Sequence, residues 1–211
     1  MSTQATNDAD RPAPLAGLRV VEFTHMVMGP AVGAILVELG AEVIKVEPIG
    51  GDATRQLLGS GAGYFSMYNR NKKSVCLNLK DPQGLELAKR LAASADVVVE
   101  NFRAGTMDKL GLGHEALAAL NPRLIYCSEK GFLSGPYEHR TALDEVAQMM
   151  GGLAYMTGPP GRPLRAGTSV IDVTGGMFGV IGVLAALEER HRTGRGRKVA
   201  SSLFETTVYL V

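Results

Sequence analysis

The 211-residue sequence has little of what marks most specialised protein classes. It contains two cysteines, no tryptophan and only 6% aromatic residues. Basic and acidic side chains nearly cancel, 22 against 21, and leave a formal net charge of +1. A chain with so little excess charge has no extended field to gather nucleic acid or anionic lipid, so we expect neither as a partner. Hydrophobic residues make up 45% of the chain and charged residues 20%, a globular mixture that argues against a disordered or collagen-like protein.

The two cysteines, Cys76 and Cys127, form no recognisable pair motif. Each lies in an apolar run, and neither has the spacing from another cysteine or a histidine that a zinc site requires. We therefore predict two reduced thiols in the core of a cytoplasmic protein. The four histidines are isolated from one another, so we expect no metal site.

Targeting and membrane signals are weak. Residues 1–13 are polar and lack the apolar stretch of a signal peptide, so we predict a disordered tail followed by one unit over residues 14–211. The range 170–187 is long and apolar enough to raise the question of a membrane span, but it contains Asp172, Thr174 and several glycines. We predict a buried core helix there and expect no membrane association.

Short β-branched runs alternate with helix-like segments along most of the chain. The pattern predicts strands at 19–23, 42–47, 74–79, 97–100, 124–128 and 199–204, and helices at 29–39, 82–95, 142–150 and 170–191. Right-handed crossovers between parallel strands place helices on both faces of a sheet. We therefore predict an α/β fold, a Rossmann-like open parallel sheet with helices on both faces. The glycine-rich range 50–63 is predicted to be an irregular loop that lines a site.

Several motifs that would assign a reaction are missing. The turn after the first strand reads THMVMGPAVG, without the G-x-G-x-x-G of dinucleotide-binding sites. The sequence has no Walker loop, and no G-x-S-x-G marks a hydrolase nucleophile. We accordingly expect no nicotinamide or flavin cofactor.

The remaining candidate for chemistry is a carboxylate, Asp172, at the start of the long glycine-rich helix. An aspartate in a first helical turn most often caps the helix, and that alternative stays open. Gly175 and Gly176 would clear one helix face for a substrate, while N–H groups at the helix start would stabilise an oxyanion. A dry, well-placed carboxylate can act in acyl transfer by forming an anhydride and then a thioester. We therefore interpret Asp172 as the candidate nucleophile.

Six segments in a fixed order resemble the class III CoA-transferases, the family of formyl-CoA transferase and carnitine CoA-transferase. They are LAGLRVVEFTHMVMGP, LGAEVIKVEP, YFSMYNRNKKSVCLNL, ADVVVENFRAGTMDKLGLG, NPRLIYCSEKGF with a following GP, and LAALEERHRTGRGRKV. The resemblance runs from residue 15 to the last residue. It implies an enzyme that moves CoA from an acyl-CoA thioester to a free carboxylic acid through an aspartyl-CoA thioester on Asp172. No cofactor beyond CoA itself is implied.

The resemblance also implies a CoA site. Its residues in this sequence would be His25, Met26, Leu77, Leu79, Asn101, Phe102 and Lys109. Aromatic and aliphatic side chains can hold adenine, and a lysine can meet phosphates. Ordinary structural roles stay open beside this one: Asn101 as a turn former, Phe102 as a core residue and Lys109 as a solvated charge.

A second branch of the family, the α-methylacyl-CoA racemases, pairs a histidine with the aspartate as acid and base. At the equivalent position this chain has Leu143, directly before Asp144. The lack of a base there disfavours two-base proton exchange. His139 is close by but offset, so a racemase-like acyl-CoA enzyme stays an alternative to the transferase.

Family members continue beyond the part that this chain resembles. The resemblance implies that the sequence is truncated before a second smaller domain, a glycine-rich lid over the aspartate and a return segment, in chains that interlock as homodimers. We interpret the apolar ending TTVYLV as a run without a helix cap, in agreement with a continuing chain. We expect the 211 residues alone to associate or aggregate and to show no turnover, which makes an inactive CoA-binding fragment the third alternative.

Overall fold

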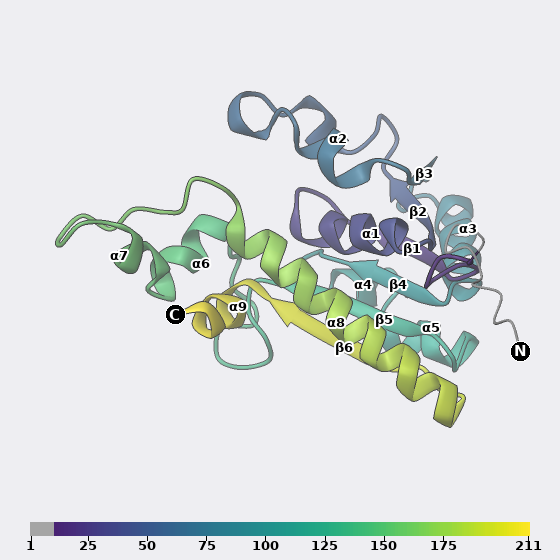
Figure 1. The fold of residues 1–211 in the computed structure, drawn as a ribbon. Coiled ribbons are helices and arrows are strands. Elements are labelled where there is room, and N and C mark those ends of the chain that lie inside the picture. Colours follow the sequence, from purple (N-terminus) through teal and green to yellow (C-terminus); the bar gives the residue numbers. More distant parts are fainter. Residues whose placement is uncertain (1–10) are drawn as a thin grey trace, which may run out of the picture.

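One six-stranded sheet organises the computed structural model, which describes residues 11–211 (Figure 1). Its strands lie in the order β3-β2-β1-β4-β5-β6, and every neighbouring pair is parallel. The strands are β1 (Arg19–Phe23), β2 (Glu42–Glu47), β3 (Lys73–Cys76), β4 (Val97–Glu100), β5 (Ile125–Lys130) and β6 (Lys198–Ser202). The chain builds outward from β1 to β3 and then returns to the other side of β1. This reversal leaves a crevice at the carboxyl ends of β1 and β4, where open α/β sheets bind ligands.

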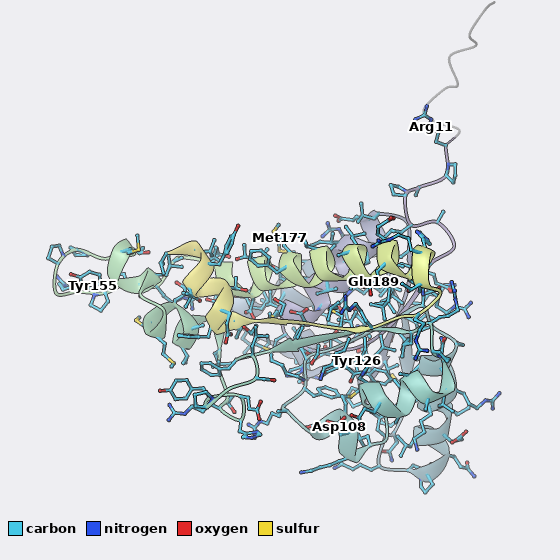
Figure 2. All side chains as sticks on the ribbon, turned by 90° about the horizontal axis from the view of Figure 1, so that it is seen from below. Arg11, Asp108, Tyr126, Tyr155, Met177 and Glu189 are labelled. Carbon is cyan, nitrogen blue, oxygen red and sulfur yellow. The ribbon has the colours of Figure 1, made fainter. Side chains whose placement is uncertain are left out.

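Helices cover both faces of the sheet, which confirms the predicted fold class. On one face lie α1 (Met28–Glu38) and α8 (Val170–Thr193), and on the other α3 (Pro82–Ala93), α4 (Thr106–Lys109) and α5 (His114–Leu120). The remaining helices are α2 (Tyr64–Asn69), α6 (Asp144–Met150), α7 (Leu153–Thr157), α9 (Leu203–Leu210) and the 3-10 turns η2 (Ala53–Gln56) and η3 (Gly59–Gly61). Figure 2 shows Tyr155 of α7 projecting from one end of the molecule.

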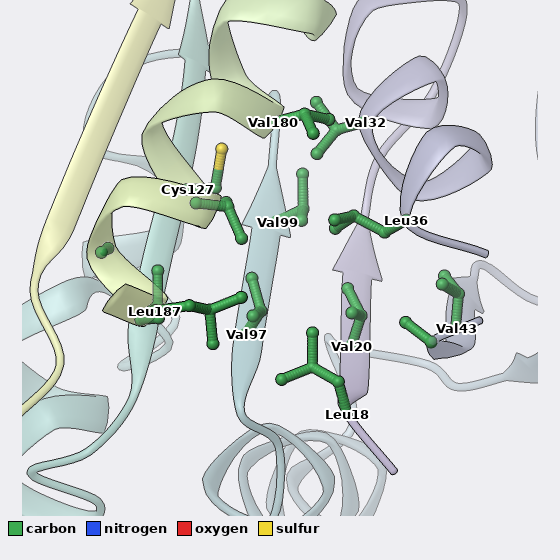
Figure 3. Close-up of a cluster of buried hydrophobic side chains, with 14 residues drawn as sticks. Leu18, Val20, Val32, Leu36, Val43, Val97, Val99, Cys127, Val180 and Leu187 are labelled. Atoms are coloured by element: carbon green, nitrogen blue, oxygen red, sulfur yellow. The ribbon is translucent and has the colours of Figure 1, made fainter. Parts of the chain in front are cut away.

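The apolar strand residues divide between two core layers. In β1, Val20 packs toward α1 and α8 and Val21 toward α3, because successive side chains point to opposite faces of a strand. Figure 3 shows the first layer, in which Val20 and Val99 of the sheet meet Leu36 of α1. Burying one such valine or leucine stabilises the fold by roughly 1.5–3 kcal/mol.

Helix α8 lies close against α1 because it presents glycines at the contact. A Cβ on Gly176 would lie 2.9 Å from the carbonyl oxygen of Met28, and one on Gly175 would lie 2.5 Å from Met28 Cε. The expectation that these glycines clear a face for substrate is therefore wrong, because α1 fills that space. Within residues 11–211, α8 is the one helix long and apolar enough to cross a membrane. Its contacts with α1 and the sheet bury one face, whereas Met177, Ile181 and Leu184 on the other face are exposed, so the predicted buried core helix is confirmed for one face alone.

The structure corrects several local predictions. Strand β6 ends at Ser202, and the apolar run after it forms helix α9. Ser202 caps this helix, since its hydroxyl accepts from the Glu205 N–H and also donates to the Glu205 carboxylate, an N-cap that the sequence interpretation missed. Cys127 is buried as predicted, but Cys76 is exposed on the edge strand β3. The loop at 50–63 contains η2 and η3. Of the predicted tail, residues 1–10 lie outside the described residues, and 11–13 are exposed and in no helix or strand.

A substitution that adds one methyl group to α8 tests its close contact with α1. We expect Gly176→Ala to lower the free energy of unfolding by about 1–3 kcal/mol, because the new Cβ meets backbone that cannot move aside. Gly182→Ala is the matched control in the same helix, since its Cβ would lie 3.3 Å from a Val199 side chain and it gains the same helix propensity. Urea unfolding of both variants measures the difference. Equal stability of the two would contradict the close-packing account.

Candidate active site

Two loops meet in the crevice between β1 and β4, and one asparagine joins them. The His25 N–H donates to Asn101 Oδ1 at 3.0 Å, and Asn101 Nδ2 donates to the His25 carbonyl at 2.8 Å. Asn101 therefore satisfies both backbone groups of His25. The rings of His25 and Phe102 lie with their centroids 5.7 Å apart. Desolvation lowers the pKa of His25, while the charge of Asp52 acts in the opposite direction.

A cavity of about 750 Å³ opens on one side of this pair, and we call it the apolar cavity. Of the predicted CoA residues, it is lined by His25, Met26, Leu77, Leu79 and Phe102. The other walls come from Val46 of β2, from Ile49 directly after this strand and from Leu57 of the 50–63 loop. Lys80 stands at the same cavity and supplies a positive charge. A pocket of this size and lining suits a planar heterocycle whose phosphates meet a lysine.

A second cavity, of about 320 Å³, contains Asp172, and we call it the carboxylate cavity. His25, Met26 and Phe102 line it as well, so they form a wall common to both cavities. Asn101 also lies on this side. The structure thus brings together all the predicted site residues except Lys109, which is exposed on α4 and lines neither cavity.

The start of α8 is capped by another aspartate. Asp144 Oδ2 accepts from the Ile171 N–H at 2.7 Å and from the Asp172 N–H at 2.9 Å. The side-chain amide of Gln148 donates to Asp144 Oδ1. These two helix N–H groups are occupied, so the expectation that they would stabilise an oxyanion is wrong. Within residues 11–211 the Asp172 carboxylate accepts no hydrogen bond, which leaves it available in the cavity.

The surroundings of Asp172 raise the pKa of its carboxyl group. Burial, with the charge of Asp144 as a second cause, raises the pKa of Asp172 to about 7, while Arg165 acts in the opposite direction. A carboxylate with this pKa changes charge near neutral pH and is more basic than a solvated one. Such a shifted group in a cavity is a mark of a functional site.

Three residues that the sequence analysis did not assign lie close to the start of α8 or at the carboxylate cavity: Tyr64 and Tyr68 of α2 lie beside the start of α8, and Glu129 lines the cavity. The Tyr64 hydroxyl of α2 lies 3.1 Å from Ser169 Oγ, directly before α8. Burial, together with the charge of Asp172, raises the pKa of Tyr68. Glu129 of β5 is fully buried, and desolvation raises its pKa to about 8. The i, i+4 spacing of the two tyrosines was the only available signal, because Glu129 resembles an ordinary strand residue.

The residues relevant to proton exchange lie at the same cavity. Leu143 and His139 both line it, together with Asp144. His139 is exposed, and its Nε2 lies 3.1 Å from Glu138. Within residues 11–211, no three histidine, cysteine or acidic side chains are grouped so as to hold a metal ion.

Comparison with known proteins assigns the chain to a family. The model of CoA-transferase family III matches residues 15–211. The chain belongs to this family. The chain is 44% identical, over 96% of its length, to the acetyl-CoA:oxalate CoA-transferase of Acetobacter aceti, of which it covers 54%. It is 41% identical over 96% of its length to the succinyl-CoA:glutarate CoA-transferase of Mus musculus, of which it covers 48%.

The same fold is found in a solved structure of a relative. A CAIB/BAIF family protein from Brucella suis superposes with a TM-score of 0.89 at 42% identity. The match covers 95% of this chain and 56% of that one. The chain thus spans about half the length of the relatives it matches.

The electrostatic influence of Asp144 on Asp172 gives a direct prediction. Asp144→Asn removes a neighbouring negative charge, so we expect the pKa of Asp172 to fall below about 7. It should stay above the ordinary value of about 3.9 for aspartate, because the burial that is the larger cause remains. Carboxyl carbon NMR of aspartate-labelled protein across pH 3–9 follows the titration. Glu115→Gln, an exposed acid on α5, is the control and should leave it unchanged, whereas an unmoved Asp172 in Asp144→Asn would contradict the coupling.

Proposed function

We propose that this chain is the part of a class III CoA-transferase that carries the nucleophile and most of the CoA pocket. The enzyme would move CoA from an acyl-CoA thioester to a free carboxylic acid. The observation that supports this most is the common wall of His25, Met26 and Phe102. A ligand with a planar head and a long arm can fill the apolar cavity and bring its far end past this wall to Asp172.

The CoA molecule has parts that suit each region. Adenine would lie between the aliphatic residues Leu77 and Leu79 and the ring of Phe102, and Lys80 would meet a phosphate. Lys109, exposed on α4, would contact a phosphate only outside the apolar cavity. The pantetheine arm would follow the wall, with the thioester in the carboxylate cavity.

The reaction would begin with the ionised Asp172 carboxylate. It attacks the thioester carbonyl, the C–S bond breaks, and CoA leaves as a thiolate, which gives a mixed anhydride. The thiolate then attacks the aspartyl carbonyl and releases the donor as its carboxylate, leaving an aspartyl-CoA thioester. An incoming carboxylate repeats the two steps in reverse and departs as the new acyl-CoA. A pKa of about 7 makes Asp172 a stronger nucleophile than an ordinary aspartate, while ionisation is still reached near neutral pH.

The substrates and the assembly are inferred from the relatives. The names of the two relatives pair acetyl-CoA with oxalate and succinyl-CoA with glutarate. We propose a dicarboxylic acid as the acceptor here as well. We also propose a cytoplasmic homodimer for a protein of the relatives' full length, with no cofactor beyond CoA.

A racemase-like reaction is the second candidate, because His139 lines the carboxylate cavity. A base there, with Asp172 as its partner, could exchange the proton beside a thioester. His139 is exposed and paired with Glu138, and the position directly before Asp144 is occupied by Leu143. Both features favour the transferase.

The covalent intermediate can be trapped. We expect hydroxylamine, added with an acyl-CoA, to modify Asp172, since it cleaves the anhydride and the thioester at the aspartyl carbonyl. Peptide mass spectrometry locates the adduct, in this chain and in a protein of the relatives' length. Asp172→Asn should abolish the adduct and transfer while the protein stays folded. It should be no less stable at pH 8, because it removes a buried charge.

The controls separate the two candidate reactions. Asp108→Asn, an exposed acid on α4, should be modified at Asp172 like the unaltered protein. An adduct elsewhere, or transfer without any adduct, would exclude Asp172 as the nucleophile. Deuterium uptake beside the thioester of a branched acyl-CoA, without an acceptor acid, would favour the racemase instead.

A further inference from the structure

Four buried ionisable side chains lie beneath the turn that connects β1 to α1. Lys45 Nζ lies 3.1 Å from Asp52 Oδ2 and 3.7 Å from Glu22 Oε1. Lys72 Nζ lies 2.9 Å from Glu22. Each of the four is at most 5% exposed at the side chain, so two positive and two negative charges are buried together. We call these four residues the buried charge cluster.

The buried charge cluster contacts backbone groups of residues 24–30. Lys45 Nζ donates to the Thr24 carbonyl at 2.7 Å, and Lys72 Nζ donates to the Pro30 carbonyl at 2.8 Å. Asp52 acts through Thr54, whose hydroxyl donates to Asp52 Oδ1 at 2.8 Å. Thr54 Oγ1 in turn accepts from the Met26 N–H at 3.0 Å. The segment that forms the wall between the two cavities is thus fixed at three points.

Met26 needs such support because its backbone is strained. Its φ is 61°, in the left-handed region that a residue with a Cβ rarely adopts. Residues in this conformation persist only where the surroundings hold them there, and they cluster at functional sites. Met26 lies in the wall, between the apolar cavity and the carboxylate cavity.

Burying four charges costs free energy of folding, and this cost also indicates that the cluster fixes the backbone conformation of residues 24–30. Well-packed apolar side chains often match or exceed a buried ion pair in stability. The buried charge cluster therefore adds little to the stability of the fold, but it can favour one backbone conformation over others. Its lysines donate to backbone carbonyls at both ends of residues 24–30, and Asp52 holds both the N–H and the hydroxyl of Thr54, which in turn binds Met26.

We propose that Thr54, anchored on Asp52 of the buried charge cluster, is a positioning residue that holds Met26 in the left-handed conformation and so fixes the wall against which CoA binds. The CoA part of this inference rests on the proposed function. The claim that Thr54 holds the backbone of Met26 is independent of the proposed function, because it concerns the protein without a ligand.

Substitutions at Thr54 test the inference. Thr54→Val keeps the shape and removes the hydroxyl, so the amide proton of Met26 should exchange faster with solvent and CoA should bind about tenfold more weakly. Thr54→Ser restores the hydroxyl and should recover both. NMR-detected amide exchange and calorimetry with CoA provide the two measurements. Thr157→Val, an exposed threonine of α7, should change neither.

A glycine at position 26 distinguishes positioning from general stabilisation. Glycine adopts φ of 61° without strain, so Thr54→Val should weaken CoA binding less in a Met26→Gly background than in the unaltered protein. An equal loss in both backgrounds would overturn the positioning role. So would a Thr54→Val variant that melts earlier yet keeps the slow exchange at Met26 and full CoA affinity. If the unaltered protein binds no CoA, the proposed function fails, and the exchange rate at Met26 alone decides the inference.

Discussion

The close approach of α8 to α1 is the constraint on which the site depends. Gly175 and Gly176 let α8 lie against Met28 at the start of α1. Because α1 begins directly after the turn that follows β1, this contact brings the first turn of α8 to the crevice between β1 and β4 (Figure 1). Asp172 stands in that turn. A side chain on either glycine would separate the helices and move the carboxylate away from the wall formed by His25 and Phe102.

The two neighbouring carboxylates, Asp144 and Asp172, have different roles at the start of α8. Asp144 accepts two N–H bonds from the start of α8 and acts as its cap, whereas Asp172 accepts none within the described residues. The cap and burial together raise the pKa of Asp172. The same interactions that hold the helix start therefore also make its aspartate basic. In the buried charge cluster, Glu22 and Asp52 each pair with a lysine, and the two lysines donate to backbone carbonyls of residues 24–30.

Much of the fold could be predicted from the sequence, because its strands are apolar and β-branched. The predicted strands at 19–23, 42–47 and 97–100 coincide with β1, β2 and β4. The prediction failed at α9, because an apolar run is compatible with a strand or with a helix, and here the N-cap of Ser202 favours the helix. At the site, Asp172 was singled out by its place at the start of the long glycine-rich helix, whereas the candidate CoA residues came from family resemblance alone. Asp144 was noted only as the neighbour of Leu143, because its contact with α8 spans 28 residues and depends on tertiary packing that no local pattern reveals.

We propose that one ligand spans both cavities, with its adenine between the aliphatic pair Leu77 and Leu79 and the ring of Phe102, and with its reactive end at Asp172. The wall of His25, Met26 and Phe102 is the feature that links them. A crystal structure with CoA bound, of a protein of the relatives' length, tests this most directly. The account predicts adenine in the apolar cavity and the thiol beside the Asp172 carboxylate. CoA bound at another surface, or with its thiol directed away from the carboxylate cavity, would contradict it.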